Sequence, residues 1–155
     1  MTEKTLVIIK PDALTRGIVG EIIHRFERKG LKIIGLKLSH LSEAQLQEHY
    51  AHHKGKPFFN ALIDFMRSAP SVLVALEGLN CVDIVRRMAG ETSGHRASPG
   101  TIRGDYSLSN QNNIVHASDS PEAAEAELKR FFKDGELYHY NRIDVDMLYA
   151  KDERK

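Results

Sequence analysis

The sequence has one cysteine, no tryptophan and no long hydrophobic run. Cys81 has no second cysteine with which to form an intrachain disulfide, which excludes a disulfide-stapled secreted scaffold and favours a reducing compartment. The apolar run Leu6–Ile9 is too short for a signal sequence, and no stretch approaches membrane-spanning length. These absences predict a cytoplasmic protein that has no membrane partner.

A charge of one sign is also missing. The 22 Lys and Arg residues nearly balance the 21 Asp and Glu residues, and the formal net charge is +1. Because no overall field would attract nucleic acid or an anionic membrane, an anionic ligand has to be bound by a local cluster of cations. The motifs G-x-x-x-x-G-K-[ST] and G-x-G-x-x-G do not occur. Their absence excludes the phosphate-binding loops that these motifs form.

Hydrophobic periodicity and capping signals predict four strands and several helices, in one domain that spans residues 1–155. The predicted strands cover residues 6–9, 31–38 (with a bulge at Gly35), 71–77 and 113–117. The predicted helices cover residues 19–29, 42–52 (with a Ser42–Gln45 capping box), 58–67, 80–90 (capped by Asn80) and 122–132 (capped by Ser120). Residues 91–105 lack apolar periodicity and are predicted to form a long loop.

The order of these elements indicates the fold class. Two helices separate the second strand from the third, so the connection is a helical hairpin and a doubly wound parallel sheet is not required. We predict an α+β, ferredoxin-like sandwich, in which a four-stranded antiparallel sheet is covered by helices. A helical hairpin insertion and a long active-site loop complete the predicted architecture.

Three of the eight histidines have a spacing that could suit a metal. His49, His52 and His53 stand at i, i+3 and i+4, which would bring them to one face of a helix. No acidic or cysteine partner is nearby, and Lys54 and Lys56 follow at once, which disfavours a cation. We therefore interpret the three histidines as exposed polar residues and predict no protein-bound metal.

His116 has a different setting, because it ends a predicted strand just before the helix that Ser120 caps. Helix N-termini bind anions. A neutral imidazole can attack phosphorus without a separate base, provided that an acceptor fixes its second nitrogen. Glu125 or Glu127 could supply this acceptor, and both could equally be solvated carboxylates.

Ordered blocks of sequence between residues 4 and 132 carry a resemblance to a known family. The most specific block is residues 113–119, Asn-Ile-Val-His-Ala-Ser-Asp, and the others are residues 5–12, 16–21, 49–50, 57–59, 90–92 and 99–105. Together the blocks resemble the nucleoside diphosphate kinases, and residues 113–119 resemble the family's signature around the phosphorylated histidine. Ala117 departs from the glycine that is common in the family and adds a methyl group beside His116.

The resemblance implies a reaction and a set of residue roles. His116 would take the γ-phosphoryl group of a nucleoside triphosphate and pass it to a nucleoside diphosphate, with ping-pong kinetics that balance nucleotide pools such as ATP and GDP. Glu127 would orient the imidazole, Ser118 would support Glu127 or the phosphohistidine, and Tyr50 would lie near the histidine. The implied nucleotide-binding residues are Lys10, Arg86, Thr92 and Arg103 at the phosphates, Lys10 and Asn113 at the sugar hydroxyls, and Phe58 and Leu62 at the base. Taken singly, Tyr50, Phe58 and Arg86 fit ordinary core or surface positions, and the ordered blocks favour their functional interpretation.

The resemblance also implies Mg²⁺ as the cofactor, carried mainly by the nucleotide's phosphates, and a homo-oligomer, with a hexamer favoured over a tetramer. Two other functions stay open: a nucleic-acid-binding ferredoxin-like module and a catalytically silent scaffold of the same family. A nucleic-acid reader would need an aromatic-rich strand and a basic face, whereas aromatic residues make up 7% of this chain and its charge is balanced. The presence of Lys10, Arg103 and His116 argues against a silent scaffold.

Overall fold

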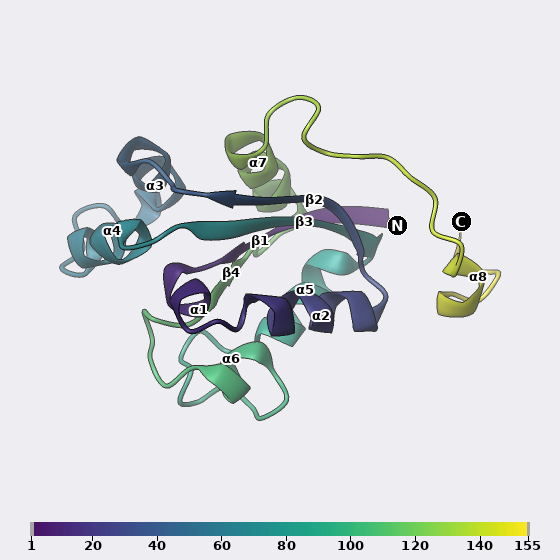
Figure 1. The fold of residues 1–155 in the computed structure, drawn as a ribbon, viewed down its shortest axis with the longest axis horizontal. Helices are drawn as coiled ribbons and strands as arrows, with labels where there is room; N and C mark the ends of the chain where they lie inside the picture. Colours follow the sequence, from purple (N-terminus) through teal and green to yellow (C-terminus); the bar gives the residue numbers. More distant parts are fainter. Residues whose placement is uncertain (1, 155) are drawn as a thin grey trace.

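The computed structural model describes residues 2–154 as an antiparallel sheet with helices on both faces (Figure 1). The four strands are β1 (Thr2–Ile9), β2 (Lys32–Ser39), β3 (Ser71–Leu79) and β4 (Val115–Ala117). Their order across the sheet is β2-β3-β1-β4, and every neighbouring pair is antiparallel. The predicted α+β sandwich of the ferredoxin-like kind is confirmed.

Most of the helices lie where capping signals and hydrophobic periodicity predict them. They are α1 (Pro11–Thr15), α2 (Val19–Lys29), α3 (Glu43–His49), η1 (Ala51–His53), α4 (Phe59–Arg67), α5 (Cys81–Ala89), α6 (Ile102–Tyr106), α7 (Pro121–Phe131) and α8 (Val145–Leu148). The capping box of Ser42 and Gln45 is present, and Ser120 accepts the backbone N–H of Ala123 at 3.1 Å. Helices α3 and α4, with η1 between them, form the predicted insertion between β2 and β3. No helix among residues 2–154 is long and apolar enough to cross a bilayer.

Strand β1 is buried on both faces of the sheet, which explains its unbroken apolar run. Val7 and Ile9 pack into the core beneath α2 and α5. Leu6 and Ile8 point the other way and pack against α3, α4 and α7. All four side chains are completely buried. The C-terminal end of β1, where Lys10 follows, is therefore fixed by packing from both layers.

The bulge that the sequence predicts near Gly35 is present. The pairing of β2 with β3 shifts register between Ile33 and Gly35. A Cβ atom at position 35 would lie 2.8 Å from Leu137 and 2.9 Å from Phe132, so glycine is the residue that fits. The missing side chain at Gly35 thus lets the segment after α7 pack closely on the outer strand.

Two helix starts differ from the prediction. Asn80 occupies the N-cap of α5, but its side chain makes no capping hydrogen bond. The carboxylate of Glu3 instead accepts the backbone N–H of Val82 at 3.2 Å, a contact between segments far apart in sequence. Helix α1 is not among the predicted helices, the first of which spans residues 19–29. Proline is a favoured first residue of a helix, and here Pro11 begins one.

The segment 91–105 is less loop-like than predicted. Thr101 caps helix α6 by accepting the N–H of Gly104 at 3.0 Å. Arg25 of α2 bonds both the carbonyl of Gly100, at 3.2 Å, and the carboxylate of Asp105, at 2.5 Å. These contacts fasten the segment to the body of the fold. Beyond α7 the chain runs along one side of the sheet to α8 (Figure 1).

Candidate active site

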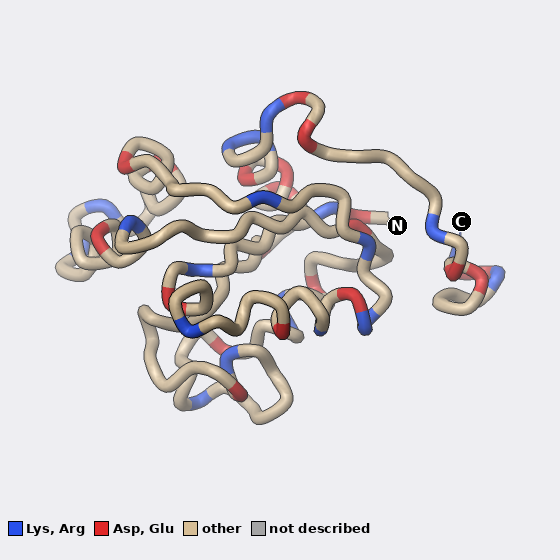
Figure 2. Tube along the Cα trace, in the orientation of Figure 1, with Lys and Arg blue, Asp and Glu red and all other residues tan. Residues whose placement is uncertain are grey.

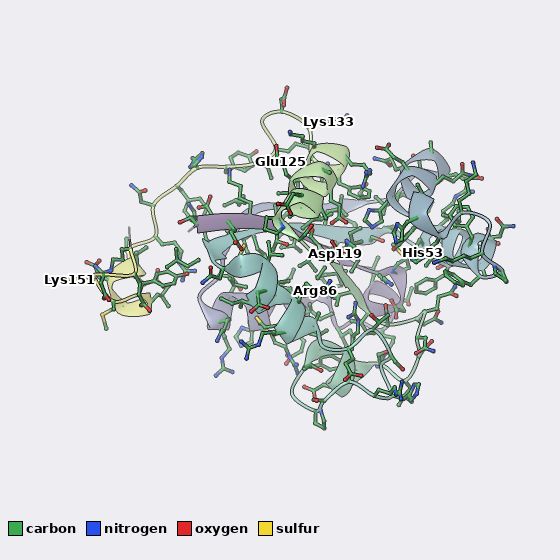
Figure 3. The ribbon with its side chains drawn as sticks, turned by 180° about the vertical axis from the view of Figure 1, so that it is seen from behind. His53, Arg86, Asp119, Glu125, Lys133 and Lys151 are labelled. Atoms are coloured by element: carbon green, nitrogen blue, oxygen red, sulfur yellow. The ribbon has the colours of Figure 1, made fainter. Side chains whose placement is uncertain are left out.

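A cavity of about 950 Å³ opens beside β4, between the hairpin insertion and the segment that contains α6. Residues of β4, α4, α5, α7 and η1 line it, together with the ends of other elements. Figure 3 labels three of its lining residues, His53, Arg86 and Asp119, which lie on the same part of the molecule, and Lys151, which lies at the far end. Apart from Ser118, the cavity brings together the site residues predicted from the sequence: Lys10, Tyr50, Phe58, Leu62, Arg86, Thr92, Arg103, Asn113, His116 and Glu127.

His116 lies on β4 and is fixed through one ring nitrogen. Its Nε2 lies 2.9 Å from Oε2 of Glu127, and the hydroxyl of Ser118 donates to the same oxygen at 2.6 Å. Burial raises the pKa of Glu127, but the hydrogen bond and charge of His116 and the bond from Ser118 outweigh it and hold that pKa below its usual range. Because an ionised carboxylate only accepts, both neighbours must donate to it. In the neutral form of His116 the single ring proton is therefore on Nε2, and the lone pair is on Nδ1.

Glu125 is the carboxylate that the sequence could not distinguish from Glu127. It is exposed and bonds Lys129 at 2.6 Å, one turn along α7. Two residues on, the helix has turned by more than half a revolution, so Glu127 faces the sheet and reaches His116. Glu127 is therefore the acceptor for His116 and Glu125 is a surface residue.

His49 is buried, and the prediction that it is exposed was wrong. Helix α3 ends at His49, so His52 and His53 fall in η1 and the three rings do not share one helical face. The ring of His49 lies edge-on to His116, with centroids 4.5 Å apart. Burial, helped by His116 and Arg130, lowers the pKa of His49 to about 2, so the ring is neutral.

His49, His116 and Glu127 each bring one possible metal ligand atom within 4.8 Å of the other two. The ligand atoms of His116 and Glu127 already share a hydrogen bond, and the guanidinium of Arg130 lies 3.3 Å from Nδ1 of His49. An arginine and a lysine beside this group oppose a cation, so its surroundings favour an anion instead.

Lys10 and Asn113 form a buried pair at the end of β1. The ammonium of Lys10 donates to Oδ1 of Asn113 at 2.7 Å, and Nδ2 of Asn113 donates to the carbonyls of Thr92 and Asn110 at 2.8 and 3.0 Å. Burial and, to a smaller extent, the charge of Arg103 lower the pKa of Lys10 to about 8, against the opposing charge of Asp12. Lys10 is thus largely charged at pH 7 and aimed at the cavity's inner end.

The guanidinium of Arg103 donates hydrogen bonds to backbone carbonyls. Its guanidinium donates to the carbonyls of Gly90 at 2.8 Å, Asn113 at 3.2 Å and Val115 at 2.7 Å. Burial and the charge of Arg86 lower the pKa of Arg103 to about 10, which leaves it charged at pH 7. Arg103 therefore has two effects, because it holds the strand that carries the histidine and it places a positive charge beside it.

The other end of the cavity is apolar. Phe58 is 42% exposed, whereas Leu62, one turn further along, is buried. The ring of His53 packs edge-on to Phe58 with centroids 5.1 Å apart. Between the two ends lies Tyr50, whose buried hydroxyl has no hydrogen-bond partner among residues 2–154 and whose pKa burial raises well above its usual value. A ligand with an anionic end and a flat apolar end fits this arrangement.

The family model described as nucleoside diphosphate kinase matches residues 3–137. The chain belongs to the nucleoside diphosphate kinase family. A nucleoside diphosphate kinase of Parabacteroides distasonis is 55% identical over 151 residues, which cover 97% of this chain and 99% of the relative. One of Pyrococcus horikoshii is 52% identical over 153 residues, covering 97% of each chain. The halophilic nucleoside diphosphate kinase of Halobacterium salinarum, solved in complex with CDP, superposes with a TM-score of 0.94 at 40% identity over 97% of this chain and all of that one.

The kinase therefore transfers the γ-phosphoryl group of a nucleoside triphosphate to a nucleoside diphosphate. Neither alternative raised by the sequence is supported. Figure 2 shows Lys and Arg interspersed with Asp and Glu along the whole trace, rather than gathered as a nucleic-acid reader would need. The high identity to kinases along nearly the full chain favours an enzyme over a silent scaffold.

Proposed function

We propose that the kinase works through a phosphohistidine on Nδ1 of His116, by a ping-pong reaction. The observation that carries this proposal is the shared acceptor Glu127, which engages Nε2 of His116 and so leaves Nδ1 as the ring nitrogen that can attack phosphorus. In the first half-reaction the bond between the γ-phosphorus and the β,γ-bridging oxygen breaks as the Nδ1–phosphorus bond forms. The nucleoside diphosphate leaves, and a second one takes the phosphoryl group back through the same steps in reverse.

The cations at the inner end of the cavity suit this chemistry. The γ-phosphoryl group passes through a loose transition state with charge spread over its oxygens, so catalysis relies on positioning and charge. Lys10 and Arg103 lie at the base of the cavity, and Arg86 and Thr92 are exposed at its rim. We assign all four to the phosphates, where charge-assisted hydrogen bonds are about twice as strong as neutral ones.

The proposed cofactor is Mg²⁺, bound mainly by the nucleotide's phosphates. The acidic residues that line the cavity are Glu91, Asp119 and Glu127, and the last is committed to His116 and Ser118. Such a sparse set does not make an all-protein cage, but it fits an ion that enters with the nucleotide. When bound, Mg²⁺ neutralises and orients the phosphates.

The apolar end of the cavity would bind the base. Phe58 offers an exposed ring face, and Leu62 lies behind it. Stacking tolerates every base because each has a π-face, so one site can take purines and pyrimidines. We assign Lys10 and Asn113 to the sugar hydroxyls as well, and propose ATP as a donor and GDP as an acceptor.

We further propose a homo-oligomer, with a hexamer favoured over a tetramer. Leu36 and Leu38 support assembly, because they are 51% and 62% exposed on the outer strand β2. Exposed apolar side chains on an edge strand favour pairing with another chain. Cys81, a buried free thiol, supports the proposed reducing compartment, the cytoplasm.

Replacing Glu127 with alanine is expected to slow the phosphorylation of His116 about 10- to 100-fold, as loss of an orienting partner of a histidine commonly does. The imidazole would lose the acceptor that fixes its tautomer. The measurement is the single-turnover rate of phosphoenzyme formation. Glu125→Ala is the matched control on the same helix and should leave the rate unchanged. An unchanged rate for Glu127→Ala, or equal slowing by both variants, would remove Glu127 from the mechanism.

The activity should also depend on the charge of Lys10. Because the pKa of Lys10 lies near 8 in the free enzyme, kcat/KM should fall as the pH rises through about 8, where an ordinary lysine would still be charged. In Lys10→Met, kcat/KM should be lower already at pH 7 and should not fall further near pH 8, because methionine does not titrate. The measurement is kcat/KM for the nucleotide between pH 7 and about 9, below the pKa of about 10 that burial and Arg86 give Arg103. A fall of equal size in the variant would show that another group is responsible.

A further inference from the structure

Ile114, two residues before His116, has a backbone conformation that its side chain disfavours. Its φ is +75°, in the left-handed region that favours glycine. The N–H of Val115 donates to the carbonyl of Asn113 at 2.8 Å, which closes a three-residue γ-turn around Ile114. The side chain is fully buried and β-branched, so the turn is strained. Such a turn persists only when its surroundings hold it.

The surroundings of this turn come from the end of β1. The carbonyl of Ile114 accepts the backbone N–H of Lys10 at 2.8 Å, and its own N–H donates to Oδ2 of Asp12 at 3.1 Å. Pro11 stands between these two partners and has a fixed φ, which keeps their spacing constant. Both polar groups of the strained residue are therefore bound by one short segment.

We propose that Asp12 is a positioning residue, whose carboxylate clamps the strained γ-turn at Ile114 and so keeps Asn113 and His116 in place for phosphoryl transfer. This inference rests on the proposed function of His116. Asp12 does not line the cavity, so it acts through the turn and not on the nucleotide. If the N–H of Ile114 lost its acceptor, the residue could relax towards negative φ, which would rotate the peptide groups on either side.

Those peptide groups are part of the site. Asn113 comes just before Ile114. Its side-chain oxygen accepts a hydrogen bond from the ammonium of Lys10, and its backbone carbonyl accepts one from Arg103. Val115 follows the turn, binds Arg103 through its carbonyl, and leads directly into His116. A rotation at Ile114 would thus displace the histidine relative to two of the cations proposed to hold the phosphates.

The charge of Asp12 could act in a second way, because the carboxylate also opposes the lowering of the pKa of Lys10 by burial and by Arg103. Asp12→Asn separates the two effects. The amide keeps an oxygen that can accept from Ile114 and removes the negative charge. Asp12→Ala removes both the acceptor and the charge.

The test measures two quantities in wild type, Asp12→Ala and Asp12→Asn at pH 7, below the wild-type Lys10 pKa of about 8. These are the hydrogen-exchange rate of the Ile114 amide and the single-turnover rate of His116 phosphorylation. Asp12→Ala should speed the exchange and slow the phosphorylation about 10- to 100-fold, the scale that a displacement of about 1 Å costs. Asp12→Asn should restore both rates.

Unchanged exchange at Ile114 in Asp12→Ala would overturn the clamp, whatever becomes of the activity. Slowing by Asp12→Asn as large as that by Asp12→Ala would assign the effect to charge and also overturn it. The exchange readout does not require His116 to be the nucleophile. The wild-type protein could form no phosphohistidine while Asp12→Ala still speeds exchange of the Ile114 amide as expected. That result would count against the proposed function and not against the clamp.

Two substitutions of Ile114 test the backbone strain directly, without relying on Asp12→Asn to restore the rates. Glycine takes positive φ without a steric cost, whereas alanine does not, and both remove most of the buried side chain. Asp12→Ala should therefore slow phosphorylation much less in an Ile114→Gly background than in an Ile114→Ala background. Equal slowing in the two backgrounds would contradict a clamp on strain.

Discussion

Replacing His116 with alanine is expected to lower the rate of phosphoryl transfer about a million-fold, the scale seen when a covalent nucleophile is removed. No neighbour can take its place. The hydroxyl of Ser118 donates its hydrogen bond to Glu127, and the ring of His49 is buried against Arg130. His116 lies at the cavity wall and belongs to neither apolar core, so its loss should leave the fold intact. The measurement is the steady-state transfer from ATP to GDP.

His116→Gln provides a second, more conservative variant. Its amide can still donate to Glu127, but it has no nitrogen lone pair with which to attack phosphorus. We expect the same loss of transfer and a melting temperature close to that of wild type. His24→Ala is the control, because His24 is exposed on α2 and lies outside the cavity. Transfer retained in either His116 variant would remove this residue as nucleophile.

Arg103→Lys is expected to lower kcat about 100- to 1,000-fold, although the charge is conserved, on the scale of losing a preorganised transition-state donor. The planar guanidinium reaches three backbone carbonyls at once, those of Gly90, Asn113 and Val115. An ammonium group has no such fixed fork and cannot hold all three. The turn before His116 would loosen while the charge moves away from the phosphates.

The measurements for Arg103→Lys are kcat, KM and the melting temperature. We expect a lower melting temperature as well as the loss of kcat, because buried carbonyls lose their donor. Arg87→Lys is the matched control, since Arg87 is exposed on α5 and makes only a 3.9 Å ion pair with Asp83. A kcat within about threefold of wild type in Arg103→Lys, less than the loss of a single good hydrogen bond, would contradict this role.

Much of the fold was predictable because strong local signals agree with the tertiary structure. The apolar run of β1, the capping box at Ser42 and the Ser120-Pro121 start each act within a few residues, and the structure confirms them. The errors occurred where a distant segment decides the outcome. Glu3 satisfies the start of α5 in place of Asn80, and no pattern around residue 80 could have indicated this.

The sequence indicated which residues make up the candidate site, but not how they are arranged. The resemblance to a family supplied the set of residues, and all of them except Ser118 line one cavity. Their roles stay predictions. The burial of His49, the backbone contacts of Arg103 and the clamp by Asp12 depend on neighbours that are distant in sequence. Asp12 lies within a family-like block, but only the structure shows that its carboxylate accepts the N–H of Ile114, whose φ is +75°.

The most direct test of the account is to incubate the kinase with Mg²⁺ and ATP labelled at the γ-phosphate, without an acceptor. We expect label on the protein that is stable in alkali, is lost in acid and moves to GDP when GDP is added. The same label should be absent from His116→Ala. Folded, magnesium-supplied kinase that takes up no label, or label that persists in His116→Ala, would contradict a phosphohistidine on this residue.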